Sequence, residues 1–137
     1  MPIYLTRSEE ETISLGEELA RRLPLKAVVL LIGDLGAGKT TLAKGIVKGF
    51  GAAAPEDVSS PTFTLIHEYS PAVYHIDLYR LDEEREVEKL GLEEIFEKKA
   101  VVLIEWGERF PGLIATNHLE VRIKHKGRDV REIRVDF

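Results

Sequence analysis

The sequence predicts a three-layer α/β domain, in which helices flank a mixed sheet with a parallel core and antiparallel hairpins. Short apolar, strand-like runs at 26–33 and 100–105 alternate with helical patterns. Paired strand-like runs at 61–81 and 118–137 are typical of hairpins. Strands that alternate with helices usually form a parallel sheet. We expect residues 1–137 to form one domain, because 137 residues suffice for one core and no linker or repeat divides them.

The N-terminal third is predicted to run strand, helix, strand, helix. Residues 3–5 fit a short edge strand. Ser8 and Glu11 have the spacing of a capping box, and leucines then recur at helical intervals until Pro24 ends the helix. The run 26–33 is apolar and rich in β-branched residues, as in a strand buried on both faces. The helix after it carries one apolar stripe.

The rest of the chain is predicted to contain two hairpins, with short acidic helices and another buried strand between them. The predicted elements are a hairpin of strands 61–69 and 73–81, one or two helices within 82–99, a strand at 100–105, and a hairpin at 118–137 turning at 126–128. In the first hairpin, period-two alternation places His75, Asp77 and Tyr79 on one face.

Composition excludes several classes of protein. The net charge of -5 argues against a strong, autonomous nucleic-acid binder, and the lack of cysteine excludes disulfides and thiolate metal sites. No apolar run is long enough to cross a membrane, and the acidic N-terminus does not resemble an export signal. We therefore expect a cytoplasmic protein without a membrane partner. Acidic residues gather in 82–97 and basic residues in 122–134, which predicts two solvated faces or, alternatively, a local docking surface.

A phosphate-binding loop is predicted between the strand at 26–33 and the helix after it. Gly33 to Thr40 match the P-loop pattern G-x-x-x-x-G-K-S/T, which indicates a P-loop NTPase fold. The predicted nucleotide-binding residues here are Gly33, Asp34, Gly36, Ala37, Gly38, Lys39, Thr40 and Thr41. Lys39 is expected to bridge the β- and γ-phosphates, and the hydroxyl of Thr40 to bind Mg²⁺.

Two acids are candidates to complete this site. Glu105 ends an apolar strand, where a buried carboxylate is costly unless it meets a cation, so we predict that it binds Mg²⁺ opposite Thr40. The usual residue is Asp; Glu105 is longer and would act directly or through a metal-bound water, and a surface acid at the end of a strand is the alternative interpretation. Asp77 is predicted to act in hydrolysis by positioning water or assisting the metal, although pairing with a nearby base is an alternative. His75 shares its face and is interpreted as a packed, hydrogen-bonded strand residue outside the chemistry.

Two further residues have competing interpretations. Thr62 either senses the γ-phosphate in a mobile loop or is an ordinary threonine beside Pro61. Trp106 follows Glu105 directly, and we favour a lid over the γ-phosphate region, with a core tryptophan as the alternative. The sequence leaves open whether Arg80 and Arg109 serve a partner or the phosphates.

The blocks "GDLGAGKTT", "SSPTFTL", "YHIDLYRL" and "IEW", in this order and spacing, resemble the TsaE (YjeE) family over nearly the whole chain. The resemblance implies an ATPase that binds ATP or ADP with Mg²⁺. Its expected partners are TsaD and TsaB, and it would meet tRNA only indirectly through their complex. That complex makes N6-threonylcarbamoyladenosine next to the anticodon of tRNAs that read codons starting with A.

The resemblance also implies roles for single residues. Metal-binding positions match Thr40 and Glu105, phosphate-contacting positions match Gly36 to Thr41, and an acid that matters for hydrolysis matches Asp77. Thr62 falls in the switch-like segment, Trp106 matches a tryptophan near the γ-phosphate, and Glu9 and Gly127 fall in parts of the family that approach the adenosine. Gly107 departs from relatives that have Pro there, which bears on the conformation of that loop.

Other functions stay open at this point. A nucleotide-gated docking module would bind ATP or ADP without needing hydrolysis. A small-molecule kinase would use the same loop, but no arginine-rich lid segment is evident, and a small GTPase would need an N-K-x-D motif that does not occur. The main prediction is an ATPase that is weak alone and depends on its partners.

Overall fold

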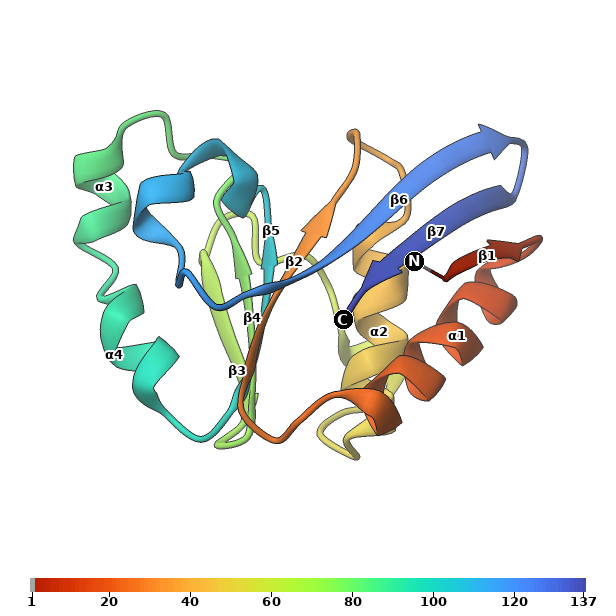
Figure 1. Cartoon of the computed structure of the whole chain (residues 1–137), viewed down its shortest axis with the longest axis horizontal. Coiled ribbons are helices and arrows are strands. Elements are labelled where there is room, and N and C mark those ends of the chain that lie inside the picture. The colour runs from red at the N-terminus through yellow and green to blue at the C-terminus, as the bar shows by residue number, and fades with distance from the viewer. Residues whose placement is uncertain (1) are drawn as a thin grey trace.

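A seven-stranded mixed sheet organises the molecule (Figure 1). The computed structural model of the chain describes residues 2–137. Its strands are β1 (Ile3–Thr6), β2 (Ala27–Ile32), β3 (Ile66–Ser70), β4 (Val73–Asp77), β5 (Val101–Glu105), β6 (Leu119–Gly127) and β7 (Val130–Asp136). The helices are α1 (Glu9–Arg22), α2 (Lys39–Gly49), α3 (Glu84–Glu88) and α4 (Leu92–Glu97), with short 3₁₀ turns η1 (Pro55–Asp57), η2 (Gly107–Arg109) and η3 (Pro111–Leu113).

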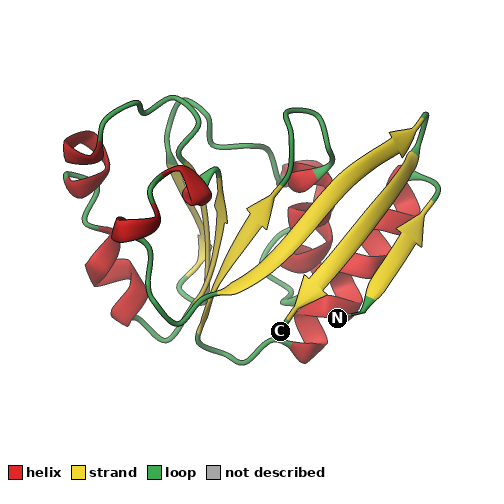
Figure 2. Cartoon of the chain, turned by 45° about the horizontal axis from the view of Figure 1, so that its top comes forward, coloured by secondary structure: helices red, strands yellow, loops and turns green. Residues whose placement is uncertain are grey.

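The strand order β1-β7-β6-β2-β5-β4-β3 has a parallel centre. Strands β6, β2, β5 and β4 run parallel to one another, whereas β3, β7 and β1 are antiparallel to their neighbours. Helices α1 and α2 cover one face and α3 and α4 lie on the other side, each over its own apolar core (Figures 1 and 2). The predicted three-layer mixed fold is confirmed. Within residues 2–137, no helix is both long and apolar enough to cross a membrane.

The first hairpin is shorter than predicted at both strands. Residues 61–65 form turns instead of strand, because the Leu65 N–H bonds to the Pro61 carbonyl at 2.7 Å and Leu65 has a φ of 71°. The predicted strand at 73–81 ends at Asp77, where a turn begins that closes with a bond from Leu81 to Leu78. The chain thus leaves the sheet on either side of β3 and β4, and residues 58–65 become a loop beside the end of β4.

Two other elements end differently from the prediction. Ser8 caps α1 by accepting from the Glu11 N–H at 3.0 Å, but the Glu11 carboxylate accepts from the Arg7 N–H, so the reciprocal half of the capping box is shifted by one residue. In the C-terminal hairpin, β6 continues through Gly127 and the turn falls on Arg128 and the next residue instead of 126–128. Both elements themselves form as predicted.

Two glycines bring α1 and α2 into direct backbone contact. A Cβ on Gly45 would lie 2.0 Å from the Ile13 carbonyl oxygen, and one on Gly16 would lie 2.6 Å from that of Leu42. Only glycine therefore permits this crossing of the helices. Because α2 begins directly after the predicted phosphate-binding loop, α1 fixes the helix on which that loop depends.

Candidate nucleotide-binding site

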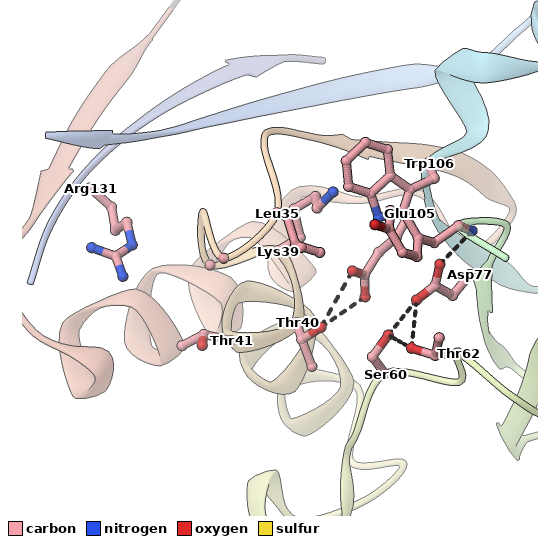
Figure 3. A pocket seen from close by; sticks show the side chains of 13 residues that line it. Leu35, Lys39, Thr40, Thr41, Ser60, Thr62, Asp77, Glu105, Trp106 and Arg131 are labelled. Atoms are coloured by element: carbon pink, nitrogen blue, oxygen red, sulfur yellow. Dashed lines mark hydrogen bonds between the residues drawn. The ribbon is translucent and has the colours of Figure 1, made fainter.

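The loop between β2 and α2 lies at the carboxyl edge of the parallel strands, beside a cavity of about 330 Å³ (Figure 3). Gly36 and Gly38 have φ values of 79° and 111°, which let the backbone N–H groups turn toward one point. The first N–H groups of α2 also point there with the positive end of the helix dipole. The cavity is lined by Leu35, Gly36, Gly38, Lys39, Thr40, Thr41, Ser60, Thr62, Asp77, Tyr79, Glu105, Trp106 and Arg131.

Lys39 is held within this loop by two contacts. Its Nζ donates to the Gly33 carbonyl at 2.7 Å and lies 3.4 Å from the centre of the Trp106 ring. The side chain is almost wholly buried, and this burial lowers its pKa, although Glu105 and other nearby acids oppose the shift. A buried ammonium group whose hydrogen bond goes to a neutral carbonyl is suited to bind an anion.

Glu105 meets the first turn of α2 from the end of β5. Parallel pairing places it beside Leu31 of β2 and Asp77 of β4. The Thr40 hydroxyl lies 3.1 and 3.3 Å from its two carboxylate oxygens, and His75 Nε2 lies 2.6 Å from Oε2. The structure therefore places Glu105 and Thr40 together as expected, and it adds His75, which the sequence interpretation left outside the site.

These groups fit a magnesium ion. Octahedral Mg²⁺ binds oxygens at about 2.0–2.1 Å, so two adjacent ligand oxygens lie roughly 2.9 Å apart. The Thr40 hydroxyl and the Glu105 oxygens are separated by 3.1–3.3 Å, close to that spacing. Such an ion takes one or two protein ligands and completes its shell with phosphates and water. Thr40 and Glu105 would hold it, and Glu105 itself is 3% exposed and needs a compensating charge.

Asp77 is the second buried acid of the cavity, and its partners come from the loop at 58–65. Ser60 and Thr62 donate hydroxyl hydrogen bonds to its Oδ2 at 2.5 and 3.2 Å, and the Tyr79 N–H donates to Oδ1 at 2.8 Å. Figure 3 shows these hydroxyl bonds. Thr62 was predicted from the sequence and Ser60 was not, although a second hydroxyl directly before Pro61 is a signal for it.

Trp106 forms one wall of the cavity. Its backbone has a φ of 66°, and its ring lies over Lys39 and 5.1 Å from the ring centre of Tyr79 (Figure 3). The next residue leaves no room for a side chain, since a Cβ on Gly107 would lie 2.8 Å from Leu30 Cδ2. The half-buried tryptophan therefore faces the phosphate loop, as a lid residue would, while its edge packs on the core.

A second, smaller cavity adjoins the opposite side of the loop. It has a volume of about 100 Å³ and is lined by Ser8, Glu9, Thr12, Gly38, Thr41, Asp129 and Arg131. Glu9 is thus brought near the loop, whereas Gly127 lines neither cavity and its contact with the nucleotide stays a prediction. Arg131 borders both cavities, and its Nε lies 3.2 Å from a Cβ placed on Gly38. This position of Arg131 was not predicted, because the sequence pattern of a hairpin does not show which other segments its side chains contact.

Arg80 and Arg109 lie outside both cavities and bind loop backbone. Arg80 donates to the carbonyls of Thr62 and Phe63 at 3.1 and 3.0 Å, and Arg109 donates to the Tyr79 carbonyl at 2.7 Å. The Arg80 guanidinium also lies 5.6 Å from the ring centre of Phe63. In this structure both arginines hold the loops on either side of Asp77.

Solved structures include a close match to this arrangement. The crystal structure of Bacillus subtilis YdiB superposes with a TM-score of 0.77 at 34% sequence identity, covering 96% of this chain and 82% of that one. The match agrees with the P-loop NTPase fold predicted from the motif.

The sequence relatives compared with this chain carry the name of one family. The chain is 41% identical over 133 residues to the tRNA threonylcarbamoyladenosine biosynthesis protein TsaE of Bacillus subtilis, covering 95% of this chain and 82% of the relative. It is 48% identical over 110 residues to TsaE of a Nostoc species and 43% over 101 residues to that of Haemophilus influenzae. It spans 66% and 63% of their lengths, and these matches cover 75% and 72% of this chain. The family model described as threonylcarbamoyl adenosine biosynthesis protein TsaE matches residues 6–133, so the chain belongs to the TsaE family.

Proposed function

We propose that this chain binds and hydrolyses ATP with Mg²⁺ and thereby supports a TsaD–TsaB complex that forms N6-threonylcarbamoyladenosine in tRNA. The observation that carries the proposal is the meeting of Lys39, Thr40, Glu105 and Asp77 around one cavity at the phosphate loop. A phosphoryl-transfer site needs a cation, a metal-binding pair and a group that positions water, and these residues supply that set. The names of the relatives, which are tRNA threonylcarbamoyladenosine biosynthesis proteins, support the pathway.

Each residue has a defined task in this proposal. The loop N–H groups and Lys39 bind the β- and γ-phosphates, and Lys39 exchanges its bond with the Gly33 carbonyl for phosphate oxygens. Thr40 and Glu105 hold Mg²⁺, which when bound neutralises charge on the phosphates. Asp77 accepts a hydrogen bond from the attacking water and orients it, while Trp106 limits the access of bulk water from its side.

Dependence on a partner follows from how Asp77 is held. Its Oδ2 accepts hydroxyl bonds from Ser60 and Thr62, so the loop at 58–65 competes with water for the carboxylate. A partner that moves this loop would free Asp77 for catalysis. We therefore expect slow hydrolysis by the chain alone and faster hydrolysis with TsaD–TsaB.

The test is ATP hydrolysis with and without purified TsaD–TsaB, for the unmodified chain and for Lys39→Ala and Glu105→Ala. We expect stimulation by the complex and its loss in both variants, with Glu97→Ala, an exposed acid at the end of α4, as the control. Unchanged multiple-turnover tRNA modification with Lys39→Ala would contradict the proposal. Full support of the complex by a Glu105→Ala protein that binds ATP without hydrolysing it would instead favour the docking-module alternative.

A further inference from the structure

His75 is the most deeply buried charged or polar side chain in contact with the candidate site. It lies in the middle of β4, directly opposite Leu103 of β5 and His67 of β3, and it is fully buried. Its Nε2 is 2.6 Å from Glu105 Oε2. Its other ring nitrogen, Nδ1, has no hydrogen-bond partner among residues 2–137.

An apolar side chain would suit this position better if only packing mattered. The strand is internal, all five of its residues are buried, and its neighbours Val73 and Ile76 are both apolar. A histidine here leaves one buried nitrogen unsatisfied, which disfavours folding. The contact that distinguishes His75 from an apolar residue is its hydrogen bond to Glu105. Because an ionised carboxylate only accepts hydrogen bonds, Nε2 carries the proton and donates it.

Glu105 needs such a contact more than an aspartate would. A glutamate has one more rotatable bond than the aspartate usual at this position, so its carboxylate has more orientations to lose. His75 bonds to Oε2, and the Thr40 hydroxyl lies 3.1 Å from Oε2 and 3.3 Å from Oε1. The bond from His75 thus fixes the carboxylate, while both of its oxygens stay close to Thr40 at the cavity.

We propose that His75 is a positioning residue that orients Glu105 for Mg²⁺ through the Nε2–H to Oε2 hydrogen bond. The inference rests on the proposed function, since it requires a magnesium–nucleotide complex at Thr40 and Glu105. Groups that hydrogen-bond to a metal ligand typically change metal affinity about 10–100-fold when removed. His75 acts through Glu105 and touches neither the ion nor the nucleotide.

The experiment measures ADP binding by calorimetry in EDTA and at increasing Mg²⁺. In His75→Met, we expect the Mg²⁺ concentration that gives half of the full change in ADP affinity to rise about 10–100-fold. The affinity for ADP in EDTA should stay unchanged. His75→Gln, whose amide Nε2–H reaches a similar point, should restore most of the Mg²⁺ response. In a Glu105→Gln background, His75→Met should add no further shift, because the shared interaction is already lost.

His67→Met is the matched control. His67 pairs directly with His75 across β3 and β4 and bonds to the Tyr69 hydroxyl, with no contact to Glu105. An equal shift in His67→Met, or no shift in His75→Met, would overturn the inference. If His75→Met does not fold, His75→Gln is compared with Glu105→Gln instead. A response of ADP binding to Mg²⁺ that is as weak in His75→Gln as in Glu105→Gln would overturn the inference. No ADP binding, or no effect of Mg²⁺ on the unmodified chain, would refute the proposed function as well, and this result is recognisable before any variant is made.

Discussion

Glu105 and Asp77 are two equally buried acids on neighbouring strands, but different parts of the molecule hold them. Each is 3% exposed, and parallel pairing places them side by side. Glu105 is bonded by His75 and Thr40, which belong to a central strand and to a helix anchored on the core. The side-chain partners of Asp77 both belong to the loop at 58–65. One half of the pocket is therefore fixed by strands and a helix, and we expect the other half, which depends on a loop, to be the more adjustable.

Shortening the acid in the fixed half should have the largest effect. In Glu105→Asp the carboxylate withdraws by one methylene and cannot reach both Thr40 and His75, and the strand cannot follow it. We expect partner-stimulated ATP hydrolysis to fall about 10²–10³-fold, as when one precisely placed charged group is lost from a phosphate site. Initial rates at saturating Mg²⁺ measure the effect. Near-normal rates would show that the fixed half tolerates displacement and that the comparison is wrong.

Removing the charge in the adjustable half should have a smaller and more selective effect. In Asp77→Asn, the side-chain oxygen can still accept from Ser60 and Thr62, so the contacts to the loop remain, while the bond from the Tyr79 N–H to Oδ1 is lost. We expect hydrolysis to fall about 10–10²-fold while ADP affinity is unchanged, because Asp77 makes no contact with the phosphate loop. Single-turnover hydrolysis and ADP titration separate the two quantities. A parallel loss of ADP affinity would place Asp77 in nucleotide binding instead.

Glu108, in η2, belongs to neither half of the pocket, and removing its charge should have the smallest effect. Among residues 2–137, its Oε1 is buried without a hydrogen-bond partner. Burial raises the pKa of Glu108 above the ordinary 4.5, although its own backbone N–H and the nearby Lys39 oppose the shift. The folded state therefore binds the proton more tightly, so the contribution of Glu108 to stability falls as pH rises from 4.5 through the raised pKa. We expect Glu108→Gln to raise the melting temperature slightly at pH 8 and not at pH 4. Equal shifts at both pH values would contradict this origin.

The fixed half of the pocket, apart from the contact of His75, was predictable from sequence because its signals are local. A motif defines the loop at Gly33 to Thr40, and an apolar strand that ends in Glu105 must deliver its acid to the same edge of the sheet. The three layers follow from the alternation of strand-like and helical runs, whereas the order of the strands is seen only in the structure. The parallel register that sets Glu105 beside β2 then places it opposite Thr40.

The adjustable half was harder to predict because its contacts join distant segments. The run at 61–65 has a strand-like composition, but its conformation is decided by turns around Pro61 and by contacts with Asp77 and Arg80. The place of Arg131 beside Gly38 depends on how the last hairpin crosses the sheet, which no pattern within the hairpin reveals. Residues marked by a local motif could thus be predicted to share the pocket, whereas contacts between segments distant in the sequence could not.

The close contact between Gly16 and Gly45 has a consequence for dissecting this protein. Residues 9–22 contribute only Glu9 and Thr12 to the lining of the smaller cavity, yet their backbone is the surface against which α2 packs. A fragment that begins after α1 would keep every residue of the phosphate-loop motif and expose the apolar flank of its helix. The smallest unit able to bind nucleotide is therefore larger than the contiguous motif, and α1 cannot be exchanged for another helix unless that helix also carries a glycine at the crossing.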